Sequence, residues 1–114
     1  MFEKNLEIGY LLDFYGEILP ERRRYIMDLY YNDDLSLSEI AEQMGITRQA
    51  VRDSIKKTEQ ELFFYEERLG LRRRLTEAET RAETALALCR AASEAVPPAL
   101  TEELEAIRRA VAME

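Results

Sequence analysis

Residues 36 to 57, SLSEIAEQMGITRQAVRDSIKK, contain the signals that decide the fold. Ser36 and Glu39 form an S-x-x-E pair, the capping box that opens a helix. Gly45 ends that helix, because glycine adopts the left-handed conformation of a tight helix exit without a steric penalty. Thr47 then caps a second helix by offering its side-chain oxygen to a backbone N–H group. Two short helices joined by a sharp turn indicate a helix-turn-helix.

The second helix of this motif has an apolar side and a basic side. Val51 and Ile55, four residues apart, continue its buried face. The candidates for nucleic-acid binding lie elsewhere on the helix and are Thr47, Arg48, Gln49, Arg52 and Lys56. Arginine and glutamine pair with the edges of guanine and adenine, and a helix N-terminus binds phosphate. The alternative is a helical hairpin used only for packing or for contact with a protein.

Length and composition limit the possible classes of protein. A chain of 114 residues holds one compact domain, or a small domain with a helical extension. Three prolines and four glycines leave long helical runs uninterrupted, so we expect an all-α fold. The N-terminus lacks the pattern of a signal peptide, and no apolar run approaches the length of a membrane span. We therefore expect a cytoplasmic protein with no membrane insertion.

The net charge of −7 argues against a protein that coats DNA by neutralising many phosphates. The charge is unevenly distributed, however. Residues 41 to 57 carry four basic and two acidic side chains and form the one net positive block of the sequence. A localised nucleic-acid site would have this distribution, and so would an ordinary solvated helix face.

Two helices are expected before the motif. Apolar residues recur at helical spacing over residues 3 to 15, and Pro20 suits the first turn of the next helix, where its missing N–H is not needed. The early turns of that helix carry three consecutive basic residues, Arg22, Arg23 and Arg24. They are candidates for contact with a nucleic-acid backbone, although such a run is more often a solvated face.

The second helix of the motif is expected to continue to residue 69, because no helix breaker occurs before Gly70. After this glycine, small and apolar residues recur at alternating steps of four and three, as in a heptad seam. The expected dimer seam consists of Leu71, Leu75, Ala78, Ala82, Ala85 and Cys89, and the pattern runs on to Val96. We therefore assign residues 1 to 70 to a helix-turn-helix domain and residues 71 to 114 to a helical extension that dimerises.

The seam has two interpretations. The long helices fold back on the N-terminal bundle of the same chain, or they pair with the same seam of a second chain. A narrow stripe rich in alanine extends beyond what a small domain can bury, so self-association is favoured. Parallel and antiparallel pairing both remain open. Pro97 and Pro98 break the run, and Thr101 is expected to cap a last amphipathic helix.

The sequence offers no set of catalytic residues. Histidine is absent, which removes Cys/His zinc clusters and histidine bases, and Cys89 is the single cysteine, which removes an internal disulfide. No glycine-rich phosphate loop occurs, and the carboxylates are scattered over expected helix surfaces. We expect a protein that is not an enzyme and that uses no metal or cofactor.

Residues 19 to 62 resemble region 4 of bacterial sigma factors, in which a Leu-Pro-x-x-x-Arg helix precedes a similar turn. The match rests on Leu19, Pro20, Ser36, Glu39, Ile40, Ala41, Gly45, Val51 and Ile55. The expected fold is therefore an all-α helical bundle that contains a sigma-region-4-like helix-turn-helix and continues into a long helical C-terminal extension.

Over more of its length the chain is similar to the YlxM family of small bacterial proteins. The similarity rests on KNLEIGYLLDFYGEIL at residues 4 to 19, on SLSEIAEQMGITRQAVRDSIKKTEQEL at residues 36 to 62 and on YEERLGL at residues 65 to 71. This resemblance implies a helix-turn-helix protein encoded beside the GTPase of the signal recognition particle, with a regulatory role in that pathway. It also implies that the side chains from Thr47 to Lys56 face DNA or the RNA of the particle.

Two functions follow as hypotheses. In the first, the protein is a dimeric regulator that binds nucleic acid through the helix starting at Thr47. In the second, it is an adaptor that binds no nucleic acid and docks its acidic helical surface onto the GTPase of the signal recognition particle. RNA in the A form has a deep, narrow major groove that a recognition helix does not enter, so binding to the particle's RNA would use its backbone, loops or ends.

Overall fold

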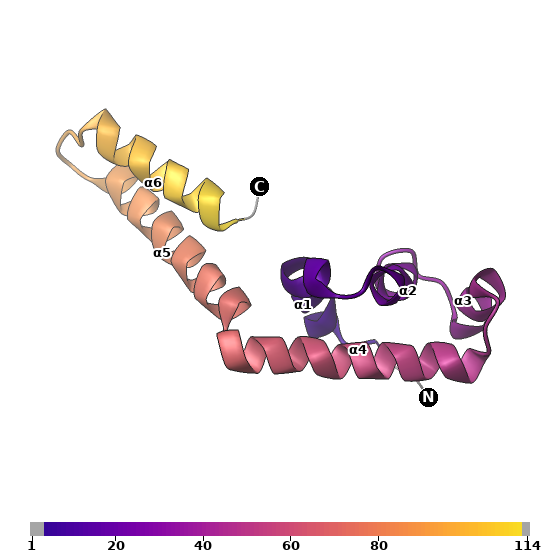
Figure 1. Ribbon diagram of the computed structural model, residues 1–114. Helices are drawn as coiled ribbons and strands as arrows, with labels where there is room; N and C mark the ends of the chain where they lie inside the picture. Colours follow the sequence, from indigo (N-terminus) through magenta and orange to yellow (C-terminus); the bar gives the residue numbers. More distant parts are fainter. Residues whose placement is uncertain (1–3, 113–114) are drawn as a thin grey trace. The chain divides into compact units, whose positions relative to one another are not determined.

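The structure is a computed structural model that describes residues 4 to 112 (Figure 1). Within these residues it has six α-helices, one short 3-10 helix and no strand, so the expected all-α fold is confirmed. The chain divides at Gly70 into two compact units, Met1–Gly70 and Leu71–Glu114.

The first unit is built on one long helix. Its elements are α1 (Leu6–Tyr15), the 3-10 helix η1 (Gly16–Ile18), α2 (Glu21–Tyr31), α3 (Leu37–Met44) and α4 (Arg48–Leu69). Helices α1, α2 and α3 all contact α4, and Figure 1 shows them arranged along it. The long helix therefore provides the surface on which the three shorter helices pack.

The first two helices begin later than the sequence pattern indicated. Helix α1 starts at Leu6, because Asn5 caps it and its side chain accepts a hydrogen bond from the Glu7 backbone N–H at 2.9 Å. Residue 3, where the pattern began, lies outside the described residues. Helix α2 starts at Glu21, so Pro20 occupies its N-cap position and not its first turn.

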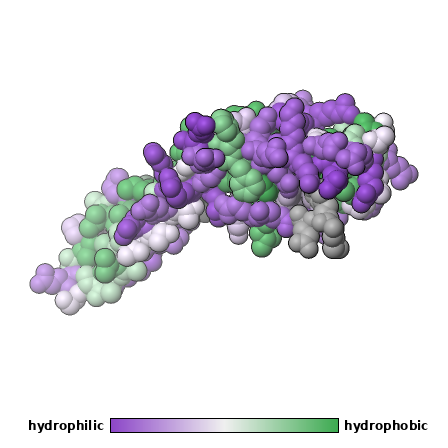
Figure 2. Space-filling model, turned by 90° about the horizontal axis from the view of Figure 1, so that it is seen from below, coloured by the Kyte–Doolittle hydropathy of each residue, from purple (hydrophilic) through white to green (hydrophobic). Residues whose placement is uncertain are grey.

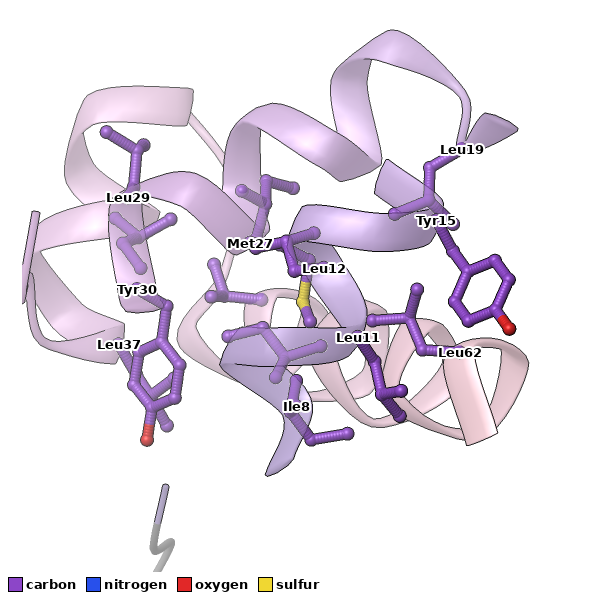
Figure 3. Close-up of a cluster of buried hydrophobic side chains, with 14 of the residues drawn as sticks. Ile8, Leu11, Leu12, Tyr15, Leu19, Met27, Leu29, Tyr30, Leu37 and Leu62 are labelled. Carbon is purple, nitrogen blue, oxygen red and sulfur yellow. The ribbon is translucent and has the colours of Figure 1, made fainter. Parts of the chain in front are cut away.

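The core of this unit centres on a stripe along α4. Val51, Ile55, Thr58 and Leu62 occur at steps of four, three and four, which places them on one side of the helix, and all four are fully buried. Leu11 and Leu62 lie close together in Figure 3, where α1 meets α4. Each fully buried aliphatic side chain contributes about 1.5 to 3 kcal/mol to folding. The Thr58 hydroxyl is satisfied locally, because it donates to the Ser54 carbonyl at 2.8 Å.

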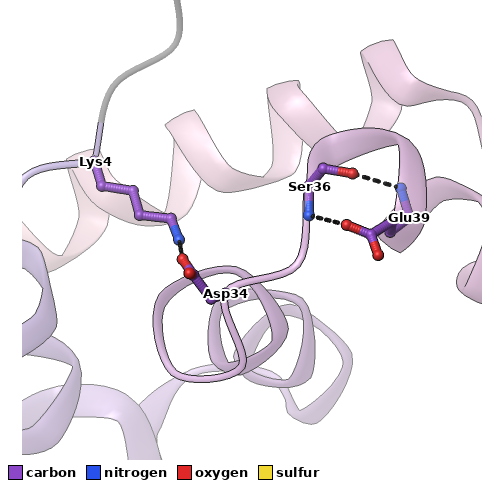
Figure 4. Close-up of polar contacts among 4 residues, drawn as sticks. All are labelled: Lys4, Asp34, Ser36 and Glu39. Carbon is purple, nitrogen blue, oxygen red and sulfur yellow. Dashed lines mark hydrogen bonds and ion pairs between the residues drawn. The ribbon is translucent and has the colours of Figure 1, made fainter.

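The helix-turn-helix forms as the sequence indicates. The Ser36 backbone N–H donates to the Glu39 carboxylate at 3.0 Å, and the Glu39 backbone N–H donates to the Ser36 hydroxyl at 3.1 Å (Figure 4). This capping box lowers the pKa of Glu39, because the hydrogen bonds from Ser36 favour the charged carboxylate. Gly45 ends α3 with φ of 69°, in the left-handed region. Thr47 caps α4 by accepting a hydrogen bond from the Ala50 backbone N–H at 3.0 Å.

Polar contacts tie the shorter helices to α4. On α2, the Arg23 side chain forms an ion pair with Glu61, with 2.9 Å between Nη1 and Oε2. The Tyr15 hydroxyl of α1 donates to the Glu66 carboxylate at 2.6 Å. The Tyr31 hydroxyl donates to Glu59, and burial together with this hydrogen bond raises the pKa of Tyr31. These contacts fix the positions of α1 and α2 along the long helix.

A further ion pair lies between the segment before α1 and the loop before α3. The Lys4 ammonium contacts the Asp34 carboxylate (Figure 4). Its hydrogen bond and its charge lower the pKa of Asp34. Asp34 has a positive φ of 59°, a conformation that aspartate tolerates better than most residues. The chain can therefore turn sharply from α2 into the capping box of α3.

The second unit is a helical hairpin of α5 (Leu71–Ala91) and α6 (Pro98–Val111), which contact each other. Two expectations about its ends are wrong. Helix α5 stops at Ala91, although the heptad pattern runs on to Val96. Thr101 does not cap the last helix, because α6 already begins at Pro98 with Pro97 at its N-cap position. Proline suits a first helical turn, where its fixed φ fits and no N–H is required.

Helix α6 lies against part of the expected dimer seam, an arrangement that neither interpretation of the sequence included. Ala82 of the seam is buried, together with its neighbour Leu86, and Ala85 and Cys89 are half-buried. Three further seam residues are exposed or half-buried, namely Leu71, Leu75 and Ala78. Pairing of two chains through this seam remains a prediction, and α6 already occupies part of the surface that such pairing would use.

Two glycines of the first unit should respond to alanine in opposite directions. Gly45→Ala should lower the free energy of unfolding by about 1 to 2 kcal/mol, because the left-handed conformation crowds a Cβ atom. Gly9→Ala should raise it by about 0.5 to 1 kcal/mol, because Gly9 lies inside α1 and a Cβ there meets nothing within 4 Å. Urea unfolding followed by circular dichroism measures both. A Gly45→Ala protein as stable as the wild type would contradict the assigned turn.

The ion pair between α2 and α4 should be structural. Arg23→Ala should lower the free energy of unfolding by about 1 to 2 kcal/mol, because the partly buried Glu61 carboxylate loses its partner. The matched control is Arg22→Ala, since Arg22 is exposed on the same helix and its loss should change stability by less than about 0.5 kcal/mol. Equal effects of the two substitutions in urea unfolding would exclude a specific role for the pair.

Candidate nucleic-acid interface

The start of α4 is an open helix N-terminus. The side chain of Thr47 satisfies one of the first backbone N–H groups of α4, and the first turn contains no acidic residue. The first N–H groups of a helix carry a partial positive charge and attract anions. Thr47, Arg48 and Gln49 are all exposed, so this end of α4 is accessible to a ligand such as phosphate.

The candidate side chains share one edge of α4. Arg48, Arg52 and Lys56 follow one another at steps of four, so they line up along the helix beside its buried stripe. Arg48 and Lys56 are exposed, whereas Arg52 is half-buried. From Thr47 to Lys56 the helix rises by about 13 Å, a length comparable to the width of about 12 Å of the DNA major groove.

Gln49 is engaged within its own helix. Its side-chain amide donates to the Asp53 carboxylate at 2.8 Å. To read an adenine edge, the amide would have to exchange this hydrogen bond for one to the base. The sequence analysis did not consider Asp53, although its spacing of four residues from Gln49 is that of neighbours on a helix surface. This carboxylate adds a negative charge to an otherwise basic segment and opposes the close approach of phosphate.

The structure separates the arginines of α2 from the candidates on α4. Arg23 pairs with Glu61, which lies nine residues beyond Arg52, or about 13 Å further along α4. Arg24 lies beside the start of η1, since its Nε would be 3.6 Å from a Cβ atom on Gly16. Arg22 and Arg24 are exposed, so their contact with a nucleic-acid backbone remains a prediction, whereas Arg23 is held in its ion pair.

The turn between α3 and α4 fixes the direction in which this edge faces. The backbone N–H groups of Gly45 and Ile46 donate to the carbonyls of Glu42 and Ala41, which closes the end of α3. Val51 is fully buried and Ile46 packs against the same core, so the first turns of α4 are anchored from below. The basic edge is therefore presented on a rigid support.

Two other kinds of site were searched for in the described part of the chain. Residues 4 to 112 contain no group of three histidine, cysteine or carboxylate side chains that could hold a metal ion. None of the helices in this range combines the length and the apolar character needed to cross a membrane. Cys89 is a half-buried free thiol in α5.

Comparisons with known proteins agree with this architecture. Residues 2 to 90 match a family model described as "UPF0122: Putative helix-turn-helix protein, YlxM / p13 like". A UPF0122 protein of Halalkalibacterium halodurans is 54% identical over 71 residues, covering 62% of this chain and 65% of the relative. One from Desulforamulus reducens is 55% identical over 65 residues, covering 57% and 56% of the two chains. A third, from Bacillus cereus strain AH187, is 51% identical over 77 residues, covering 68% and 70%.

The matched regions contain the motif described above. The chain spans less than two thirds of the length of the first two relatives and slightly more of the third. The family model covers all of α1 to α4, and it ends at residue 90, just before the end of α5. Because this match extends over most of the sequence, the chain belongs to the YlxM / p13-like family of helix-turn-helix proteins.

Proposed function

We propose that this protein is a regulatory protein that binds duplex DNA through the N-terminal part of α4. One observation supports this proposal above the others. The exposed edge formed by Arg48, Arg52 and Lys56 begins at an open helix N-terminus and stands on a rigid helix-turn-helix. In proteins with this motif the second helix enters the major groove, with its first residues contacting base edges.

Each candidate has a distinct role in this proposal. The free N–H groups at the start of α4, with Thr47, hold a phosphate. Arg48 and Arg52 contact guanine edges or phosphates, and Gln49 reads adenine once its amide leaves Asp53. Lys56, further from the helix start, contacts the backbone as a point charge. Duplex DNA is favoured over duplex RNA because the major groove of A-form RNA is too narrow for a helix.

The charge of the protein sets the expected strength of binding. With a net charge of −7, the chain repels nucleic acid everywhere except at a local basic site. Each phosphate that is neutralised changes the slope of log K against log salt by about −0.9. Three basic side chains on α4 therefore give a slope of about −3. We infer weak nonspecific binding and a regulatory role that depends on a preferred sequence.

Two finer elements complete the proposal. The first is a place in the signal recognition particle pathway, which rests on the resemblance to the YlxM family and not on any contact in this chain. The second is a homodimer, because paired recognition helices match paired half-sites on DNA. As a regulatory protein of this kind it needs no catalytic group, and we propose no enzymatic activity.

The arginines of α4 should carry DNA binding. In a fluorescence anisotropy titration with duplex DNA, the variant combining Arg48→Ala and Arg52→Ala should lose at least about tenfold in affinity, and its salt slope should fall by about 2. The control variant combines Arg81→Ala and Arg109→Ala, which changes the net charge equally by removing two exposed arginines of the second unit. Probes with the protein's own upstream DNA and with the particle's RNA identify the preferred nucleic acid. Equal losses in both variants would contradict the assigned site.

A second function is favoured by the acidic surface. The chain has 23 acidic and 16 basic side chains, which suits docking onto a basic protein. In this alternative the protein is an adaptor of the signal recognition particle GTPase and does not use nucleic acid.

The adaptor function predicts a complex with the purified GTPase. Sedimentation velocity should show a faster boundary when the two proteins are mixed at low salt, and the complex should weaken as salt screens the opposite charges. The variant with alanine at Arg48 and Arg52 should bind the GTPase as well as the wild type does. An unchanged boundary at low salt would exclude the adaptor function.

A further inference from the structure

The apolar face of α6 points only partly toward α5. Leu100, Leu104, Ile107 and Val111 occur at steps of four, three and four, so they form one stripe along α6. Leu100 and Ile107 are nevertheless each 47% exposed. Figure 2 shows the apolar surface that gathers on this hairpin. An apolar stripe that remains this open on a helical hairpin indicates a missing partner.

The contacts with α5 explain why the stripe is open. The Arg90 side chain of α5 forms an ion pair with Glu105 of α6 at 3.4 Å, which turns the Glu105 side of α6 toward α5. Thr101 and Arg108 are half-buried on that side of α6. Because Leu100 and Ile107 lie further round the helix, α5 covers them only at their edge.

The hairpin buries too little to be stable as it stands. Its two helices contain 21 and 14 residues, yet within its described part only Ala82 and Leu86 are buried apolar side chains. Ordering the backbone of one residue costs about 1 to 2 kcal/mol, whereas one buried leucine contributes about 1.5 to 3 kcal/mol. Helices of this length depend mainly on the packing of an apolar face. The exposed stripe therefore requires further cover.

We propose that a second copy of this chain covers the stripe, with the two α6 helices antiparallel about a twofold axis. The stripe is complementary to itself in this arrangement. When Leu104 lies opposite the partner's Ile107, Leu100 lies opposite the partner's Val111, and all four positions of one stripe meet the four of the other. Two hairpins joined in this way form a four-helix bundle, a common solution for helices with one apolar face.

The charges of α6 select the antiparallel direction. Its N-terminal half carries Glu102, Glu103 and Glu105, and its C-terminal half carries Arg108 and Arg109. Antiparallel pairing places the acidic half of one helix beside the basic half of the other. Parallel pairing would place like charges together. The helix dipoles also favour the antiparallel arrangement.

This inference deepens the homodimer of the proposed function by naming its surface, and it rests on that homodimer. It also changes the expected surface, since α6 already covers Ala82 of the heptad seam. The family model ends at residue 90, so α6 and its stripe lie outside the region that identifies the family.

The oligomeric state of the full chain tests the inference. Sedimentation equilibrium of the wild type should give twice the chain mass of 13.3 kDa. Ile107→Glu should raise the dissociation constant by at least about 100-fold, because a carboxylate would be buried in the apolar contact. Leu88→Glu is the matched control, since Leu88 is 68% exposed on the same hairpin but lies on the side of α5 away from α6, and it should remain dimeric.

A charge exchange guards against simple unfolding of the hairpin. One variant combines Glu102→Arg with Glu103→Arg, and another combines Arg108→Glu with Arg109→Glu. Each alone should dimerise less tightly than the wild type, and an equimolar mixture should restore the dimer as a heterodimer. Circular dichroism should show wild-type helix content for every variant.

Three results would overturn the inference: a monomeric wild type at about 100 µM, a dimer that survives Ile107→Glu, or equal dissociation by Leu88→Glu. Its failure is distinguishable from that of DNA binding. A monomer that binds DNA through Arg48 and Arg52 would overturn the dimer surface alone. A dimer that binds no DNA would overturn the function of α4 alone.

Discussion

The buried stripe of α4 is the constraint on which the first unit depends. Val51, Ile55, Thr58 and Leu62 face one side of the helix, and α1, α2 and α3 all pack against this helix. The Arg23–Glu61 ion pair and the Tyr15–Glu66 hydrogen bond add positions at which the short helices are fixed along it. One helix thus forms both the centre of the core and the support of the candidate interface.

This dual use explains the position of the candidate interface. Because α4 buries one side over its whole length, its remaining surface carries the polar residues, and at its N-terminal end these are mostly basic. The capping box of α3 and the left-handed Gly45 set the angle at which this end leaves the turn. The edge from Arg48 to Lys56 is therefore positioned by packing and not by the flexibility of a loop.

Local signals predicted the fold well, and long-range contacts were missed. Ser36, Gly45 and Thr47 act within a few residues of themselves, so their roles could be predicted from sequence and are confirmed. The ion pair of Arg23 depends on Glu61, 38 residues away, and no local pattern indicates it. Thr101 resembled a helix cap, but two prolines before it already start α6. The heptad pattern of α5 predicted a partner helix, and α6 of the same chain supplies part of that contact.

The most direct test of the DNA-binding surface is to map it on the protein. Amide chemical shifts of isotope-labelled protein, followed during titration with a short DNA duplex, locate the contact residue by residue. The account predicts that the perturbed amides cluster from Gly45 to Lys56, at the turn and the first turns of α4. Perturbations absent from this segment, or concentrated in α6 instead, would contradict it.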